Sequence, residues 1–152
     1  MEKSLPITRA LVSVFDKSAL VPLATFLKEL NVLIISTGGT ARFLEKNGFT
    51  VTDISSVGQF PEILDGRVKT LNPRIHAGIL YDRHKNSHLE TMAELDLAPI
   101  DLVITNLYPF EEIAQNPDSD LGQLIENIDI GGPTMIRAAA KNHRHVVILS
   151  SP

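Results

Sequence analysis

A chain of 152 residues has the length of a single domain. It contains no cysteine, which excludes disulfides and thiolate chemistry, and its five histidines show no spacing typical of a zinc site, so we expect no bound metal. The net charge of −4 argues against nucleic acid as a partner, and no stretch approaches the ~18 apolar residues of a membrane span. We therefore expect a soluble, cytoplasmic protein.

The first third of the chain alternates apolar strands with amphipathic helices. The pattern predicts strands at 9–14, 31–35 and 49–54, and helices at 18–30 and 41–47. Strands separated by helices of this length pair in parallel through right-handed crossovers. The carboxyl ends of the strands then lie on one side of the sheet, where α/β proteins bind ligands.

A glycine loop follows the second predicted strand, with the sequence Ser36-Thr37-Gly38-Gly39-Thr40. Two glycines let the backbone turn tightly and present N–H groups to an anion at the positive end of a helix. We interpret this loop as a phosphate site, with Ser13 and Lys17 after the first strand on the same side. The alternative is an ordinary turn in which Thr40 caps the helix.

Regular structure is hard to assign between residues 55 and 80, although 60–64 has the pattern of a helical turn. This stretch carries Arg67, Lys69 and Thr70, then Asn72 and His76, within a dozen residues. In an extended segment the two cations flanking Val68 would share one side and line a pocket with positive charge. The alternative is a solvated basic loop.

The second half predicts a helix at 86–97 and strands at 100–105 and 145–149, with a polar tract at 111–120 that is a helix end or an exposed loop. Asn106 and Tyr108 follow the fourth strand and so belong to the ligand side of the sheet, although a tyrosine there can equally pack at the rim. Pro133 suits a first helical position after Gly131-Gly132, and Arg137 and Lys141 then share a face of that helix.

Six motifs in this order carry a resemblance to a known family. They are 13–17 (SVFDK), 36–41 (STGGTA), 65–70 (DGRVKT), 106–110 (NLYPF), 127–134 (NIDIGGPT) and 140–142 (AKN). Over residues 8–152 the chain resembles the N-terminal inosine monophosphate cyclohydrolase domain of the bifunctional purine biosynthesis protein. That domain closes the purine ring of formyl-aminoimidazole-carboxamide ribonucleotide, with loss of water, and uses no metal or organic cofactor.

The resemblance implies a methylglyoxal-synthase-like α/β fold, doubly wound with a mainly parallel sheet, and a purine ribonucleotide as the small-molecule partner. It implies a homodimer. By resemblance, the catalytic residues are Lys69, Tyr108, Asp129 and Lys141. The substrate-binding residues it implies are Ser13, Lys17, Ser36, Thr37, Gly38, Gly39, Thr40, Arg67, Thr70, Asn106, Ile130 and Gly131.

Two departures limit the resemblance. Many relatives have serine in place of Phe15 and histidine in place of Asn72, so neither position receives a chemical role. The family's domain also continues beyond residue 152 and is followed by a transformylase domain, so we expect 1–152 to be a truncated cyclohydrolase domain without the second activity.

Three questions stay open from sequence. A nucleotide-binding regulatory module of the same fold would need only the phosphate loop, since fold does not determine function. Methylglyoxal synthase itself is disfavoured because residues 65–70 and 106–110 match the cyclohydrolase pattern. Residues 133 and 141 lie about 12 Å apart in a straight helix, so Asp129 meets Lys141 only if the glycine pair folds back or the lysine reaches along the helix.

Overall fold

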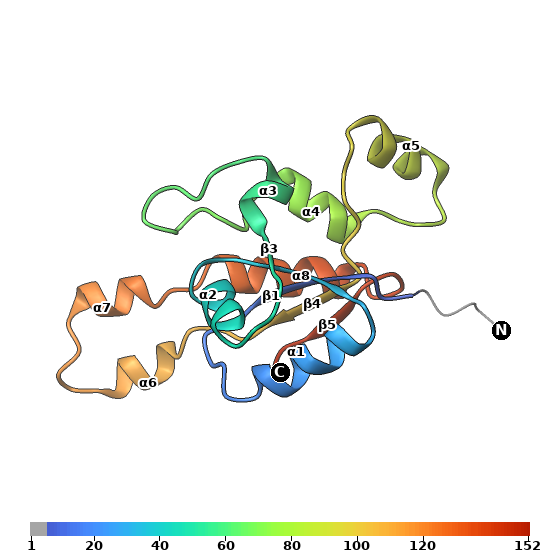
Figure 1. Cartoon of the computed structure of the whole chain (residues 1–152). Helices are drawn as coiled ribbons and strands as arrows, with labels where there is room; N and C mark the ends of the chain where they lie inside the picture. The colour runs from blue at the N-terminus through green and yellow to red at the C-terminus, as the bar shows by residue number, and fades with distance from the viewer. Residues whose placement is uncertain (1–5) are drawn as a thin grey trace.

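The computed structural model describes residues 6–152 and shows a five-stranded, entirely parallel sheet with helices on both faces (Figure 1). The strands are β1 (Arg9–Ser13), β2 (Leu33–Ser36), β3 (Thr52–Asp53), β4 (Leu102–Thr105) and β5 (Val147–Leu149). Their order in the sheet is β3-β2-β1-β4-β5, and every neighbouring pair is parallel. The predicted doubly wound α/β fold is confirmed.

Eight helices are present in residues 6–152. They are α1 (Leu20–Glu29), α2 (Gly38–Lys46), α3 (Ile54–Gly58), α4 (Pro73–Leu80), α5 (Asn86–Glu94), α6 (Phe110–Gln115), α7 (Leu121–Glu126) and α8 (Gly131–Lys141). None of these helices is long and apolar enough to cross a membrane.

Side-chain alternation along the buried strands divides the core into two clusters. In β1, Ala10 and Val12 pack with residues of α1 and α2, whereas Leu11 between them packs with α3, α4 and α8 on the other face. All three residues are essentially inaccessible, as expected for a strand covered by helices on both faces. This burial explains the continuous apolar runs that marked the strands in the sequence.

Three predicted boundaries were wrong near the glycines and in β3. Helix α2 begins at Gly38 and not at residue 41, and α8 begins at Gly131 and not at Pro133, so both glycine pairs lie in first helical turns. Only residues 52–53 of the third predicted strand pair with β2. The glycine pairs therefore form helix N-termini, not separate loops.

The stretch between β3 and α5 contains two helices that periodicity did not predict. Asp53 caps α3 by accepting the N–H of Ser55 at 2.7 Å, and Asn72 caps α4 by accepting the N–H of Arg74 at 2.8 Å, with Pro73 in the first turn. The helical turn expected at 60–64 is absent, and Ile63 instead forms an antiparallel bridge with Val68. Residues 73–80 are therefore a packed helix and not a ligand loop.

The polar tract after β4 is helical over residues 111–115 and not helical over 116–120, so it combines a helix end with an exposed loop. Figure 1 shows α6 and α7 as an arm extending away from the sheet, and neither helix contains a buried residue. Asp120 and Gln123 form a reciprocal capping box at the start of α7.

The strand order reverses between β1 and β4. From β1 the chain moves outward to β2 and β3, then returns to β4 on the opposite side of β1. Loops leaving the carboxyl ends of β1 and β4 therefore diverge and leave a crevice, which is where open α/β sheets bind ligands.

Candidate active site

A cavity of about 650 Å³ lies at the carboxyl ends of β1, β2 and β4, within the size range of small-molecule sites. Most of the predicted site residues line it. These are Ser13, Lys17, Thr37, Gly39, Thr40, Arg67, Lys69, Thr70, Asn106, Tyr108, Asp129, Ile130 and Gly131. Segments that are far apart in the sequence thus converge on one place.

The first loop, after β1, is held in place from both sides. Thr40 Oγ1 donates to the carbonyl of Val14 at 3.0 Å and accepts its N–H at 3.1 Å. On the other side, Asn106 Oδ1 accepts the N–H of Phe15 at 2.6 Å, and Asn106 Nδ2 donates to the carbonyl of Asp16 at 2.9 Å. Thr40 and Asn106 therefore position the loop that carries Lys17.

The first turn of α2 forms one wall of the cavity. Thr37 precedes the helix with an extended backbone, and Gly38 has a φ of +51°, a conformation that strongly favours glycine. The first N–H groups of a helix have no acceptor within it and carry partial positive charge. This turn can therefore bind an anion, in agreement with the predicted phosphate site.

Two residues of the glycine motif do not line the cavity. The Ser36 hydroxyl is fully buried and donates to the carbonyl of Val12 at 2.7 Å, so it links β2 to β1. Gly38 is not among the residues that line the cavity, although an added Cβ would come within 3.6 Å of Nζ of Lys69, which does line it. Both contribute through the shape of the turn and not through direct contact with the cavity.

The start of α8 forms a second wall. Asp129 Oδ1 accepts the N–H of Gly132 at 2.9 Å, so its carboxylate is fixed at the helix N-terminus. A Cβ on Gly131 would lie only 2.4 Å from Thr70 Oγ1. Glycine at 131 therefore allows α8 to approach the basic segment closely, and two helix N-termini face one cavity.

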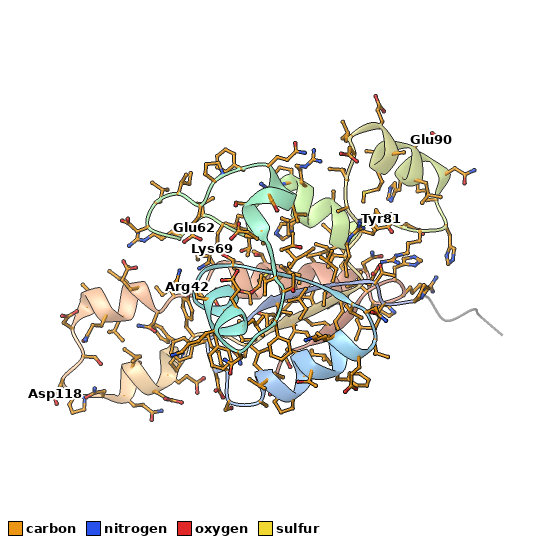
Figure 2. The ribbon with its side chains drawn as sticks, in the orientation of Figure 1. Arg42, Glu62, Lys69, Tyr81, Glu90 and Asp118 are labelled. Atoms are coloured by element: carbon orange, nitrogen blue, oxygen red, sulfur yellow. The ribbon has the colours of Figure 1, made fainter. Side chains whose placement is uncertain are left out.

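The basic segment places its two cations differently. Lys69 reaches toward Gly38, and Figure 2 shows Lys69 and Glu62 extending toward the start of α2. Arg67 forms an ion pair with Glu126 of α7, and both side chains are more than half exposed. An exposed pair of this kind contributes little to stability, so Arg67 is free to exchange partners when an anion arrives.

Tyr108 lies on the rim of the cavity, 38% exposed, and packs edge-on against Phe15, with ring centroids 5.6 Å apart. Burial raises the pKa of the Tyr108 hydroxyl above its ordinary value, and the carboxylates of Asp129 and Glu62 raise it further. The hydroxyl is therefore protonated at neutral pH and can donate a hydrogen bond into the cavity.

Lys141 is not in the site. It is exposed at the last position of the eleven-residue helix α8, about 15 Å along the axis from the Gly131 end, and it does not line the cavity. The predicted contact of Asp129 with Lys141 required the glycine pair to fold back or the lysine to reach along the helix. The glycine pair is instead the first turn of a continuous helix that separates the two residues.

Sequence reasoning gave no role to three carboxylates near the site, one of which, Asp65, lines the cavity within the 65–70 motif. Glu126 lines the cavity and pairs with Arg67, and Glu62 lies close enough to Tyr108 to affect its pKa. Glu126 directly precedes the 127–134 motif, but neither residue has a local pattern that marks it.

A comparison with known protein families identifies the family of this fold. The family model described as the MGS-like domain matches residues 19–134, which is most of the chain. The chain belongs to the MGS-like domain family. The expected fold family is thereby confirmed, and the cavity occupies the ligand side of an MGS-like domain.

Among curated proteins, this MGS-like domain is similar to bifunctional purine biosynthesis proteins PurH. It is 56% identical over 144 residues to the protein of Caldicellulosiruptor bescii and 55% identical over 153 residues to that of Cutibacterium acnes, covering 95% and 100% of this chain. The chain spans only 28% and 29% of the length of these relatives.

A solved structure, the crystal structure of ForH, is similar with a TM-score of 0.82 and 39% sequence identity. The similarity covers 94% of this chain and 72% of that one.

Proposed function

We propose that this MGS-like domain is an inosine monophosphate cyclohydrolase, which closes the purine ring of formyl-aminoimidazole-carboxamide ribonucleotide with loss of water. The observation that carries the proposal is that Lys69, Tyr108 and Asp129 line the same cavity as the first turn of α2. The similarity to purine biosynthesis proteins supports the choice of substrate.

The substrate phosphate would bind at the first turn of α2. Thr37, Gly39 and Thr40 line that part of the cavity, and Lys17 supplies a positive charge from the neighbouring loop. Arg67 would leave its ion pair with Glu126 and bind a polar group of the substrate. Thr70, Ile130 and Gly131 would line the part of the cavity that holds the base. This anchoring holds the carboxamide next to the formyl group.

Ring closure joins the carboxamide nitrogen to the formyl carbon. Because both groups belong to one molecule, orientation supplies much of the acceleration. Negative charge that develops on the formyl oxygen is stabilised by Lys69 and by the protonated Tyr108 hydroxyl. Asp129 accepts the proton from the attacking nitrogen and passes it to the oxyanion, which gives a carbinolamine. The hydroxyl then leaves as water together with the proton of the former formamide nitrogen, and the C=N bond of the ring forms.

A nucleotide-binding regulatory module would use the same α2 turn without turnover. The basic segment and Tyr108 distinguish the two functions, because neither is needed to bind a phosphate at that turn. Binding of the ribonucleotide without formation of inosine monophosphate would favour the regulatory module.

We also propose that the chain forms a homodimer through the arm and the turn that follows it. Leu121 and Ile128 are 71% and 54% exposed, and Ile125 and Ile130 beside them are about half exposed. Exposed apolar groups at this density mark association surfaces. Sedimentation velocity should show a dimer that Leu121→Glu dissociates. The control Leu30→Glu, at an exposed leucine just after α1, should leave the dimer intact.

The test of activity is incubation of pure protein with the formylated ribonucleotide, with absorbance reporting inosine monophosphate. Lys69→Ala should lower kcat on the order of 10²–10³-fold with a smaller change in KM, as expected for loss of an oxyanion donor. Lys46→Ala, an exposed lysine at the end of α2, is the matched control. If folded Lys69→Ala retains the wild-type kcat and only binds more weakly, the role assigned to Lys69 is wrong.

Arg67→Ala should behave differently from Lys69→Ala, because a positioning guanidinium acts in the ground state as well, and its KM should rise more than its kcat falls. Tyr108→Phe combined with Lys69→Ala should cost less than the sum of the single losses if both groups serve one oxygen. If the losses of activity are additive, Tyr108 and Lys69 interact with different atoms of the substrate.

A further inference from the structure

Three potential metal ligands cluster at the end of the sheet that lies opposite the cavity. Asp82 and His84 follow α4, and His145 precedes β5, so all three lie toward the amino ends of the strands. One ligand atom from each residue lies within 4.8 Å of the others. The proposed ring-closing chemistry uses none of them.

The spacing of Asp82 and His145 matches that of neighbouring ligands on one ion. His145 Nε2 lies 3.1 Å from Asp82 Oδ1. With metal–ligand bonds of about 2.1 Å, adjacent ligand atoms are separated by about 3.0–3.4 Å. The His84 and His145 rings meet edge to face with centroids 4.9 Å apart. The third ligand atom belongs to the exposed His84 and lies within 4.8 Å of the other two.

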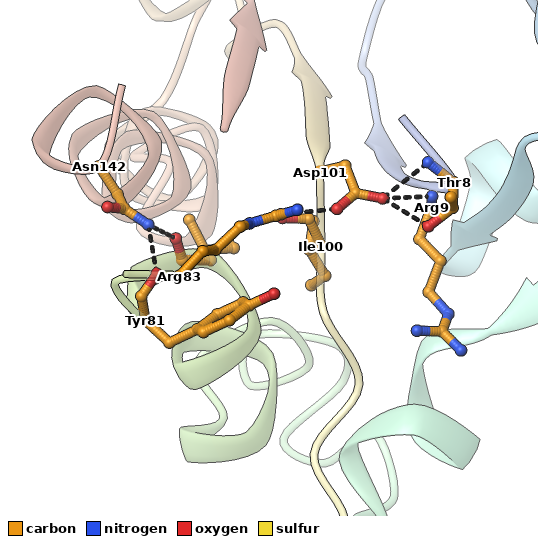
Figure 3. Close-up of polar contacts among 8 residues, drawn as sticks. Thr8, Arg9, Tyr81, Arg83, Ile100, Asp101 and Asn142 are labelled. Carbon is orange, nitrogen blue, oxygen red and sulfur yellow. Dashed lines mark hydrogen bonds and ion pairs between the residues drawn. The ribbon is translucent and has the colours of Figure 1, made fainter. Parts of the chain in front are cut away.

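The residues on either side of Asp82, which are Tyr81 and Arg83, are held by polar contacts (Figure 3). Before it, Asn142 Nδ2 donates to the carbonyl of Tyr81 at 2.9 Å. After it, Arg83 pairs with the buried carboxylate of Asp101 at 2.6 Å, and that carboxylate also accepts the N–H groups of Thr8 and Arg9. A ligand held this firmly loses little conformational entropy when a metal binds.

The ligands themselves are also oriented. Asp82 Oδ1 accepts the N–H of His84 at 2.9 Å, and the N–H of Asp82 donates to His88 Nδ1 at 2.9 Å. The His145 ring is buried, with only 4% of the side chain exposed, whereas Asp82 is about half exposed. One face of the cluster is therefore rigid and protected, and the other is open to an incoming ion.

An ion pair between Asp82 and His145 leaves part of the arrangement unexplained. The contact with Asp82 engages only the His145 imidazole. The His84 ring lies against the His145 ring, and the His84 ring nitrogens have no hydrogen-bond partner in residues 6–152. Two imidazoles with one carboxylate suit zinc and its neighbours in the first transition row, whereas Mg²⁺ and Ca²⁺ prefer oxygen ligands throughout.

We propose that Asp82, His84 and His145 bind a divalent transition-metal ion of the zinc class, with water in the remaining coordination positions. The bound ion would link the segment after α4 to the turn before β5. Because it joins residues far apart in the chain, it stabilises the folded state by mass action. This inference is independent of the proposed cyclohydrolase function, since the cluster lies away from the cavity.

The test is titration of tag-free protein with Co²⁺, followed by visible absorption, and with Zn²⁺, followed by calorimetry. We expect one ion per chain and a higher unfolding temperature in Zn²⁺, with no response to Mg²⁺. His84→Ala and Asp82→Asn should weaken Zn²⁺ binding by about tenfold or more, since even loss of an outer-shell partner costs that much. Histidine 84 is exposed, so its substitution should not disturb folding.

His143→Ala is the matched control, because His143 is an exposed histidine on the neighbouring turn outside the cluster. It should bind Zn²⁺ as the wild type does. The proposal is overturned if no stoichiometric binding occurs, or if His84→Ala binds as tightly as the wild type. Equal weakening in His84→Ala and His143→Ala would show adventitious binding to surface histidines only.

Discussion

Asn106 and Phe15 connect the two strands at which the sheet order reverses. Asn106 Oδ1, just beyond β4, accepts the N–H of Phe15, just beyond β1, at 2.6 Å. The amide nitrogen of the same side chain donates to the carbonyl of Asp16 at 2.9 Å. One side chain therefore sets the distance between the two loops that bound the cavity.

Asn106→Ala should remove this connection at a modest cost in stability. The substitution also removes a bond at 3.2 Å from the N–H of Asp16 to Asn106 Oδ1. We expect a loss of about 1 kcal/mol in the free energy of unfolding, because all three bonds are solvent-exposed. Nucleoside monophosphate binding should weaken further, since the loop that carries Lys17 loses its support. Urea unfolding and calorimetry measure the two effects, and Asn47→Ala, which removes a bond within one helix end, is the control. Unchanged nucleotide affinity would contradict the positioning role.

Gly131→Ala should force α8 away from the basic segment. Its Cβ would meet Thr70 Oγ1 at 2.4 Å, and such overpacking costs about 1–3 kcal/mol. In a Thr70→Ala background the penalty should shrink, because the clashing hydroxyl is absent. Gly39→Ala has no neighbour nearer than 4.0 Å to its added Cβ and should be close to neutral. An equal cost with and without Thr70 would show that the clash is not the cause.

Burial lowers the pKa of the His76 imidazole below its ordinary value, although a hydrogen bond with the Thr70 backbone acts in the opposite direction. The unfolded chain therefore binds the proton more tightly, and stability should fall as the pH drops below the unfolded pKa of about 6.5. His76→Gln should reduce this decline, whereas His143→Gln should not. Chemical unfolding at several pH values between about 7 and 5 measures the slopes.

The ionisation of Tyr108 offers a separate test of its environment. Its pKa is raised by burial and by two nearby carboxylates, and burial also raises the pKa of Tyr81, the other tyrosine of the chain. Ultraviolet titration should show both phenols ionising above pH 10, with loss of stability as the pH rises through those values. In Tyr108→Phe only the Tyr81 transition should remain. A midpoint at or below 10 for Tyr108 would contradict its assigned role as a donor.

Much of the site could be predicted because many of its residues lie in loops that follow the carboxyl ends of the strands. The apolar runs of β1, β2 and β4 with intervening helices predict parallel pairing, and parallel pairing brings the following loops to one edge. Lys17, Thr37 and Tyr108 could be placed together on that basis alone. The short helices α3 and α4 escaped prediction because their signals are caps, at Asp53 and Asn72, rather than long periodic patterns.

The sequence by itself determined the fold class and the edge of the sheet on which the cavity lies, since both follow from periodicity and from the handedness of crossovers. Only the tertiary structure decided that Asn106 supports a loop, that Lys141 lies outside the cavity and that His145 meets Asp82. These relationships join residues distant along the chain, or depend on where a helix begins. No local pattern encodes them, because they arise when packed elements bring side chains together.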